Sequence, residues 1–514
     1  MKKTLLCIIF LLSSLFANSQ RHDANWVLGG EGAGIHANVI IEFDTAGPVN
    51  YSVPLSIASM ALENASISDA SGNLLFLTNG IRLYNRNMDT IPNGELALPT
   101  ILSSVIPYGL NQRQGCMFLP WPGDSNLYAL LHTTYDYTYP PGHPAATGLP
   151  LPLFLYLTVL DKNLNGGLGG VVYKNIPVLN DTMTRSGGGL SVTRHANGRD
   201  WWIVMKKHYR NRYYKLLLTP SGISLQGFQL LGPDSTKRYG ELYIFSPDGN
   251  ILAGPVGENT AIHPLAIMDF DRCSGTLSNF QLVYTPPTSN YGCEDIDFSS
   301  NSRYLYANER VKVFQFDVQD RTTSGAIQNS MIQVVDTAWT TETCDSGYVG
   351  GKLFYAFGGL APDKRLYYFT IASCNELTYL EYPDSSGLLS SMNYAGLNFP
   401  GLHTGGVPYF PNYRLGPVVG SVCDSLTAIH ELQPDEVSLY PNPAKDHITV
   451  QSIRSLSNAE ITLMNVQGQV LSRKVFGFGN NFELDLPCDM GNGIYFLRIH
   501  STEGAVSKKV VVQR

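Results

Sequence analysis

A repeated turn-and-strand pattern constrains the fold of this chain more than any other feature. Each copy joins a polar turn, rich in Asp, Asn, Ser or Gly, to a short strand of aromatic and aliphatic residues. In tight hairpins, Gly or a small polar residue supplies the positive φ that the turn requires. Recurrence over about four hundred residues predicts a repeat architecture. The six copies begin at Ser71, Asp124, Asn197, Asp248, Asn301 and Asp363.

The spacing of the copies indicates the type of repeat. The second turn residues stand at positions 72, 125, 198, 249, 302 and 364, which gives steps of 53, 73, 51, 53 and 62 residues. Alternating apolar stretches such as 154–161 and 311–317 flank the turns. About four strands per unit of this length is the pattern of a β-propeller blade, whereas the coils of a β-helix, the rival fold, are much shorter.

The number of blades depends on how the ends of the repeat region pair. Strands are expected near 26–28 and 40–43, and we expect them to pair with the segment around 407–410 to close a further blade. The sequence therefore predicts an all-β chain with a seven-bladed β-propeller, and six or eight blades remain as alternatives.

The order of short phrases resembles a propeller family common in exported proteins of the Bacteroidetes. The phrases are N-A-S-I-S-D at 64–69, H-A-N-G-R-D-W-W at 195–202, F-S-P-D-G at 245–249 and F-Q-F-D at 314–317. The resemblance covers roughly residues 24–415 and implies a propeller without a settled activity. Ser302 and Lys364 stand where the family's turns have Gly, a departure expected to affect the turn type and not the fold.

The N-terminus has the three parts of a secretory signal peptide. Met1-Lys2-Lys3 is basic, an apolar run follows to Phe16, and small residues lead to Ser19. The run is shorter than the roughly 20 apolar residues that span a bilayer. We expect cleavage after Ser19, with a retained membrane anchor as the alternative and no transmembrane segment in the mature protein.

The C-terminal region reads as a separate small domain. Its alternating apolar residues indicate about seven short strands in residues 436–514, which favours a small immunoglobulin-like β-sandwich. Pro and Gly interrupt any regular element before it. We therefore expect a signal peptide at 1–19, a propeller at 20–420, a linker at 421–435 and the C-terminal domain at 436–514.

This domain resembles the C-terminal sorting domain of type IX secretion substrates. Its L-Y-P-N-P opening, N-x-x-G-x turn, G-I-Y-F-L-R-I strand and basic-then-apolar final strand occur in the family's order. The resemblance implies the type IX translocon as a partner and a location in the medium or on the outer-membrane surface, reached through the periplasm. An ordinary binding or spacer sandwich is the alternative. The sorting-signal residues carried over are Pro441, Asn442, Pro443, Gly468, Gly493, Tyr495, Lys508 and Lys509.

Composition excludes some functions. The net charge is −7 and no basic block occurs, which argues against a nucleic-acid partner. Seven cysteines remain after signal cleavage, so in an oxidising compartment at least one stays unpaired. Because no catalytic motif lies in a usable context, we assign no catalytic residue, no metal site and no cofactor.

Three histidines are candidate ligand-binding residues. His195 begins a hairpin, and His263 and His403 lie near Pro or Gly loops. Grouped on one propeller face, they would favour an enzyme. Alternatively, His195 anchors the Asn197-Gly198 turn through a side-chain hydrogen bond.

An acidic cluster also offers oxygen ligands suited to calcium. It consists of Glu294, Asp295 and Asp297. Because this spacing does not put all three on one strand face, we expect solvated edge residues.

These features favour an exported interaction protein that binds an unknown glycan or protein. Repeated blades, the lack of a catalytic motif and the delivery tail support this hypothesis, although the propeller fold alone decides no function. The alternatives are a secreted enzyme, such as a polysaccharide lyase or a lactonase-like hydrolase, and a structural matrix or adhesion component.

Overall fold

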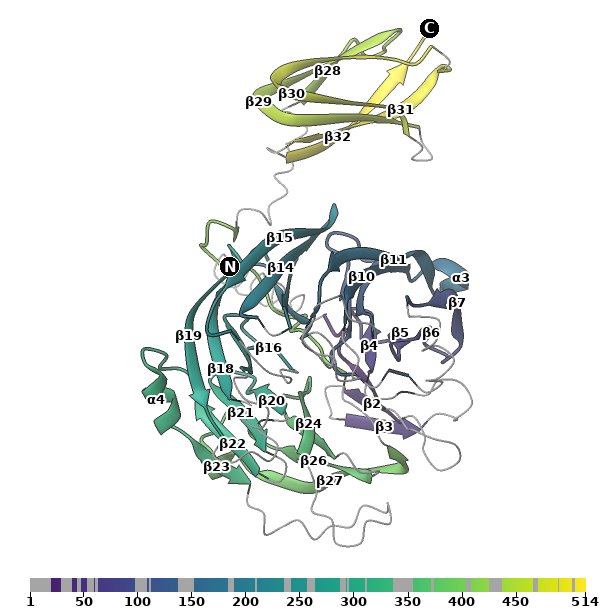
Figure 1. Cartoon of the computed structure of the whole chain (residues 1–514). Helices are drawn as coiled ribbons and strands as arrows, with labels where there is room; N and C mark the ends of the chain where they lie inside the picture. The colour runs from purple at the N-terminus through teal and green to yellow at the C-terminus, as the bar shows by residue number, and fades with distance from the viewer. Residues whose placement is uncertain are drawn as a thin grey trace, which may run out of the picture. The chain divides into compact units, whose positions relative to one another are not determined.

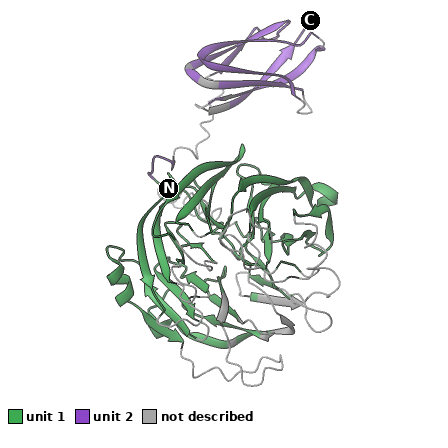
Figure 2. Ribbon diagram, in the orientation of Figure 1, with its two compact units in different colours: residues 1–419 green, residues 420–514 purple. Residues whose placement is uncertain are grey.

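The chain divides into two units, residues 1–419 and 420–514 (Figure 2). Each unit is described by itself. Within the described residues, no helix has the length and apolar character needed to cross a membrane. The predicted signal peptide, His263, Glu294 and Gly468 lie outside them. The structure, a computed structural model, describes residues 20–28, 39–43, 48–52, 60, 63–97, 109–110, 112–136, 152–183, 189–208, 210–234, 242–256, 264–286, 293, 295–309, 312–335, 355–370, 374–403, 408–424, 437–465, 470–488, 490–501 and 504–514.

Six four-stranded antiparallel sheets form a propeller-like ring in the first unit (Figure 1). The first three sheets cover the N-terminal half of this ring, and in each sheet the strands follow one another in chain order. Their strands are β4 (Ala65–Ser68), β5 (Leu74–Thr78), β6 (Arg82–Asn85), β7 (Thr90–Glu95); β8 (Cys116–Pro120), β9 (Leu127–Thr133), β10 (Phe154–Asp161), β11 (Gly170–Asn180); and β12 (Ser191–Arg194), β13 (Trp201–Lys206), β14 (Arg212–Thr219), β15 (Gly222–Leu230).

The remaining three sheets repeat this plan, with a short helix α4 (Ser324–Asn329) before the last strand of the second of them. First strands of neighbouring sheets contact one another, so these strands face the centre of the ring. The strands are β16 (Ile244–Phe245), β17 (Ile251–Pro255), β18 (Leu265–Asp271), β19 (Thr276–Tyr284); β20 (Asp295–Phe298), β21 (Tyr304–Glu309), β22 (Lys312–Asp317), β23 (Ile332–Val335); and β24 (Tyr355–Leu360), β25 (Leu366–Thr370), β26 (Cys374–Leu380), β27 (Met392–His403).

Apolar side chains between neighbouring blades hold the ring together. One buried cluster joins Phe76, Phe118 and Trp201, which come from three successive blades. Burial of a large apolar side chain contributes roughly 1.5–3 kcal/mol. Both faces of a blade pack on a neighbouring blade. Strands such as β13, the second of its blade, are therefore buried at every position, and their sequences show no apolar–polar alternation.

The six predicted turns each join the first and second strand of a blade, and three of them have a residue other than Gly at the second turn position: Ser125, Ser302 and Lys364. Ser302 has φ 62° and Lys364 has φ 69°, in the region that Gly249 also occupies. The N–H of each donates to the carbonyl three residues earlier, Ser299 for Ser302 and Ala361 for Lys364, each at 2.9 Å. The departure from Gly therefore leaves the turn geometry unchanged, although positive φ is costly for other residues.

A three-stranded sheet lies beside the ring. It consists of β1 (Asn25–Leu28), β2 (Val39–Phe43) and β3 (Pro48–Ser52), paired in that order. β1 contacts β4, whereas β2 and β3 contact β27. The strands expected near 26–28 and 40–43 therefore exist.

Their expected pairing with the segment around 407–410 is wrong for its described part, because residues 408–413 form no strand. Pro408 and Pro411 lack the N–H groups that a sheet ladder needs.

The second unit has five strands connected by antiparallel pairing. The sequence predicted about seven short strands. Two of the five strands in the described residues are instead long, because each continues through register shifts. A separate core that includes Ile461, Phe482, Leu497 and Val510 supports them. The strands are β28 (Val437–Tyr440), β29 (His447–Met464), β30 (Val470–Asp485), β31 (Gly493–Ser501) and β32 (Gly504–Val512).

Candidate functional site

His195 makes two hydrogen bonds within the protein and is only 5% exposed. Its Nδ1 accepts the N–H of Asn197 at 3.1 Å, and its Nε2 lies 3.1 Å from the carbonyl oxygen of Cys273. The ring also packs against Trp202. With Nδ1 as acceptor, Nε2 carries the proton and donates it to Cys273. These contacts leave neither ring nitrogen for a ligand and fit the role of a turn anchor.

The other predicted histidines are not brought to His195 among the described residues. His263 lies outside them. His403 is the last residue of β27, and its backbone lies opposite Cys374 of the neighbouring strand β26. This blade is a different one from the blade that contains His195.

Several residues expected to act as the sorting signal lie at the edge of the second unit. Asn442 Oδ1 accepts the N–H of Val511 at 2.9 Å, and its Nδ2 donates to the carbonyl of Lys509 at 3.2 Å. The Asn442 side chain thus supplies the final strand with hydrogen bonds that a neighbouring strand would otherwise make. The bonds Tyr440–Pro441 and Asn442–Pro443 are cis. Gly493 begins β31, Lys508 and Lys509 lie on β32, and the Tyr495 hydroxyl donates to the carbonyl of Gly491 at 3.0 Å.

A segment without secondary structure, residues 408–414, runs along the centre of the ring; we call it the central segment. Tyr413 donates its hydroxyl to the carbonyl of Phe118 at 2.7 Å, and Asn412 donates to that of Pro247 at 2.8 Å. Arg414 forms two bonds with Asp23, at 2.6 and 2.7 Å. Phe410 packs on Trp26. The side chains of the central segment therefore connect three separate sheets.

Two carboxyl groups on β20 lie at the centre of the ring. Asp295 and Asp297 occupy alternate positions and so share one face of the strand. Arg113 Nη2 lies 3.2 Å from Asp295 Oδ2 and donates to the hydroxyl of Tyr409 at 3.2 Å. The N–H of Gly358, on β24, also donates to Asp295. Asp295 thus has both a cation and a backbone N–H as partners.

Asp297 has a different environment. Burial raises its pKa well above the ordinary range; the neighbouring Asp295 raises it further, and Arg113 lowers it. Its Oδ2 is buried and has no hydrogen-bond partner among the described residues. A Cβ atom on Gly358 would stand 2.0 Å from this oxygen, so the approach of the two strands requires glycine there. The two neighbouring carboxyl groups therefore differ in their partners, and burial favours the protonated form of Asp297.

The expectation that Asp295 and Asp297 are solvated edge residues is wrong, since they are only 1% and 7% exposed. The missed signal is their position, because they lie on the strand directly before the repeated turn, which is the inner strand of each blade. Three or more metal-binding side chains gather nowhere among the described residues.

Glu63 is a further buried carboxyl, and it joins two blades. Its Oε2 and Oε1 accept the N–H groups of Gly115 and Cys116, each at 2.9 Å. Burial raises its pKa to about 8 although these bonds lower it. Sequence reasoning missed this residue, because it stands alone before β4.

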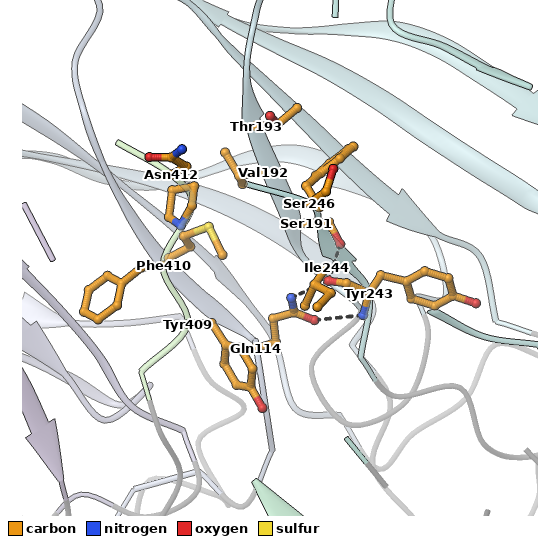
Figure 3. Close-up of a pocket in the computed structure, with 13 residues that line it drawn as sticks. Gln114, Ser191, Val192, Thr193, Tyr243, Ile244, Ser246, Tyr409, Phe410 and Asn412 are labelled. Atoms are coloured by element: carbon orange, nitrogen blue, oxygen red, sulfur yellow. Dashed lines mark hydrogen bonds between the residues drawn. The ribbon is translucent and has the colours of Figure 1, made fainter. Parts of the chain in front are cut away.

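Two hollows flank the central segment and share Ile244, Phe245 and residues 409–412. The smaller, of about 60 Å³, lies against β12, where Gln114 is hydrogen bonded to the backbone of Tyr243 (Figure 3). The larger, of about 450 Å³, we call the central pocket. Its volume is in the range of small-molecule sites. The central pocket is lined by residues of β1, β16, β20, β24 and the central segment, including Trp26, Phe245, Asp297, Ser300, Asp384 and Arg414.

Residues 438–513 match the family model of the secretion system C-terminal sorting domain. This match supports the type IX sorting role expected from the sequence and implies export to the cell surface or secretion. A search of curated protein sequences found no match.

Solved structures resemble the chain at low identity. A protein from Lactobacillus plantarum shares 12% identity with a TM-score of 0.41, covering 75% of this chain and 99% of its own. The periplasmic gluconolactonase of Pseudomonas aeruginosa shares 14% with a TM-score of 0.35, covering 90% and 99%. The hydrazine synthase of Kuenenia stuttgartiensis shares 11% with a TM-score of 0.35, covering 65% and 86%. These likenesses assign no activity to the chain.

Proposed function

We propose that this protein is a secreted or surface-attached interaction module, delivered by its sorting domain, whose propeller binds a ligand in the central pocket. The observation that carries the proposal is the pairing of a sorting-domain match at 438–513 with a pocket of about 450 Å³ at the ring centre. The pocket combines apolar walls with a few polar groups, the composition of ligand sites in general.

The route and the remaining architecture complete this proposal. The signal peptide takes the chain to the periplasm of a Bacteroidetes host, and the type IX translocon recognises the tail. Cys273 and Cys423 each take part in a disulfide bond, which fits an oxidising compartment. The sheet β1–β3 serves as the seventh blade, and the tail folds as an immunoglobulin-like sandwich, with domain bounds 20–420 and 436–514.

A second function has one observation in its favour. Asp295 and Asp297 are neighbouring buried carboxyl groups, and burial raises the pKa of Asp297. Carboxyl pairs with a raised pKa occur at sites of acid–base catalysis. A secreted hydrolase or lyase acting in the central pocket is therefore the alternative. It predicts a chemical change in a bound ligand, which product analysis detects.

Ser300→Trp tests the pocket. Ser300 is half-buried at the pocket rim, where its hydroxyl donates to Asp384 at 2.7 Å, so an indole there fills the cavity. Thermal shifts of the mature protein are measured against neutral sugars, acidic polysaccharides, peptides and divalent metals. A ligand at 100 times its Kd stabilises the wild type by about 2.7 kcal/mol, and this shift disappears in the variant.

The matched control is Ser221→Trp, in the exposed turn between β14 and β15. It keeps the ligand shift of the wild type. Equal shifts in wild type, Ser300→Trp and Ser221→Trp would place the ligand elsewhere and reject the proposed site.

A further inference from the structure

Two residues that line the central pocket each have a buried polar atom without a hydrogen-bond partner among the described residues. The atoms are Nε1 of Trp26 and Oδ2 of Asp297, in side chains from β1 and β20. The two residues are 1% and 7% exposed. An unsatisfied buried polar group costs about 1–3 kcal/mol, and nearly all such groups in folded proteins have a partner. One donor and one carboxyl oxygen at the same pocket indicate a shared ligand.

The walls and rim of the pocket narrow the ligand class. Phe245, Phe298 and Phe410 provide apolar surface. At the rim, Arg414 pairs with Asp23 at 2.6 Å, and the lining also includes one further cation, Lys364, and one further carboxylate, Asp384. A pocket with aromatic walls, orphaned polar groups and balanced charge suits a ring that has both apolar C–H faces and hydroxyl groups.

We propose that the central pocket binds a neutral sugar ring, with Trp26 and Asp297 as its buried hydrogen-bonding residues. This proposal rests on the proposed function, because it names the ligand class of the same pocket. A sugar hydroxyl can accept the Trp26 N–H, since hydroxyl oxygens have two lone pairs and one proton. Another hydroxyl of the ring bonds to Asp297.

The protonation state of Asp297 supports this arrangement. Burial and the neighbouring Asp295 raise its pKa, while Arg113 lowers it without reversing the direction. The groups facing Asp297 are Asp295 on its own strand, Arg113 before β8, Tyr409 of the central segment and Gly358 of β24. The raised pKa favours the protonated carboxyl, which can both donate to and accept from a sugar hydroxyl.

Three substitutions in the mature protein test the proposal by titration calorimetry. The probes are methyl glucoside, methyl galactoside, methyl mannoside and N-acetylglucosamine, with glucuronate and glucosamine as charged counterparts. At least one neutral probe binds the wild type, and the charged counterparts bind at least tenfold more weakly. Trp26→Phe and Asp297→Leu each weaken binding about tenfold, because each removes one hydrogen-bonding group. Asp297→Asn stays within about threefold, because the amide also donates and accepts.

Trp121→Phe is the matched control, because the Trp121 N–H donates to the carbonyl of Pro220 away from the pocket; it binds as the wild type does. Thermal unfolding confirms that each variant is folded. Preference for a charged probe, or binding unchanged by both Trp26→Phe and Asp297→Leu, overturns the proposal. So does a liganded crystal with only ordered water at these two atoms. If Ser300→Trp abolishes the binding of peptides or polyanions only, the sugar proposal fails while the proposed function stands. If Ser300→Trp abolishes the binding of no class of probe, the proposed function fails.

Discussion

Arg113→Met is expected to destabilise the propeller by about 3–5 kcal/mol, because it leaves a buried carboxylate without its cation. The Arg113 and Asp295 side chains are 9% and 0% exposed. The same substitution removes the donor to Tyr409 and the group that opposes the rise in the pKa of Asp297. Urea unfolding followed by tryptophan fluorescence measures the loss, since all five Trp residues lie before position 340 in the first unit.

Two further variants distinguish the loss of the Arg113–Asp295 ion pair from the general effect of replacing an arginine. Arg303→Met breaks an exposed ion pair with Asp317 and costs less than about 1 kcal/mol. Arg113→Met combined with Asp295→Asn recovers most of the stability, because neither charge is then left alone. If Arg113→Met costs no more than Arg303→Met, the central ion pair does not stabilise the ring as described.

The second large effect concerns pH and Glu63. In the folded protein its pKa is raised from 4.5 to about 8. Between these values the folded chain keeps a proton that the unfolded chain releases, so this residue's contribution to stability falls as pH rises. Where the pH lies well between the two pKa values, the contribution of Glu63 to the free energy of unfolding falls by about 1.4 kcal/mol per pH unit. Glu63→Gln, which cannot ionise, removes this contribution.

The measurement is the difference in unfolding free energy between wild type and Glu63→Gln at pH 5, 6, 7 and 8. Comparing the two proteins cancels groups that titrate in the opposite direction, such as His132, whose pKa burial lowers to about 3. The wild-type advantage should shrink steadily toward pH 8. Glu95→Gln, at an exposed position, should show a constant difference. A constant difference for Glu63→Gln as well would contradict the assigned pKa.

The sequence predicted the strands and turns of the blades well, because those features are local. A polar turn followed by alternating apolar residues specifies a hairpin wherever it occurs. The turns at Ser302 and Lys364 keep this geometry without Gly, which shows that packing of the flanking strands outweighs the local preference. The tail was identifiable for a similar reason, since residues such as Asn442 act within one small unit.

Ring closure and the central site could not be predicted, because they depend on contacts between distant segments. The central segment was expected to pair as a strand, but its prolines exclude a ladder and its aromatic residues pack between sheets instead. Asp295 and Asp297 read as solvated acids, since nothing near them in the sequence shows that Arg113, 182 residues away, lies 3.2 Å from Asp295. Glu63 was missed for the same reason.

The most direct test of the central claim, export by the C-terminal tail, is cell fractionation of the native host expressing the full chain or a chain lacking residues 436–514. Both retain the signal peptide, and protease treatment of intact cells distinguishes surface from periplasmic protein. We expect the full chain to reach the surface or the medium, whereas the truncated propeller accumulates, folded, in the periplasm. Normal surface display or secretion of the truncated protein would contradict it.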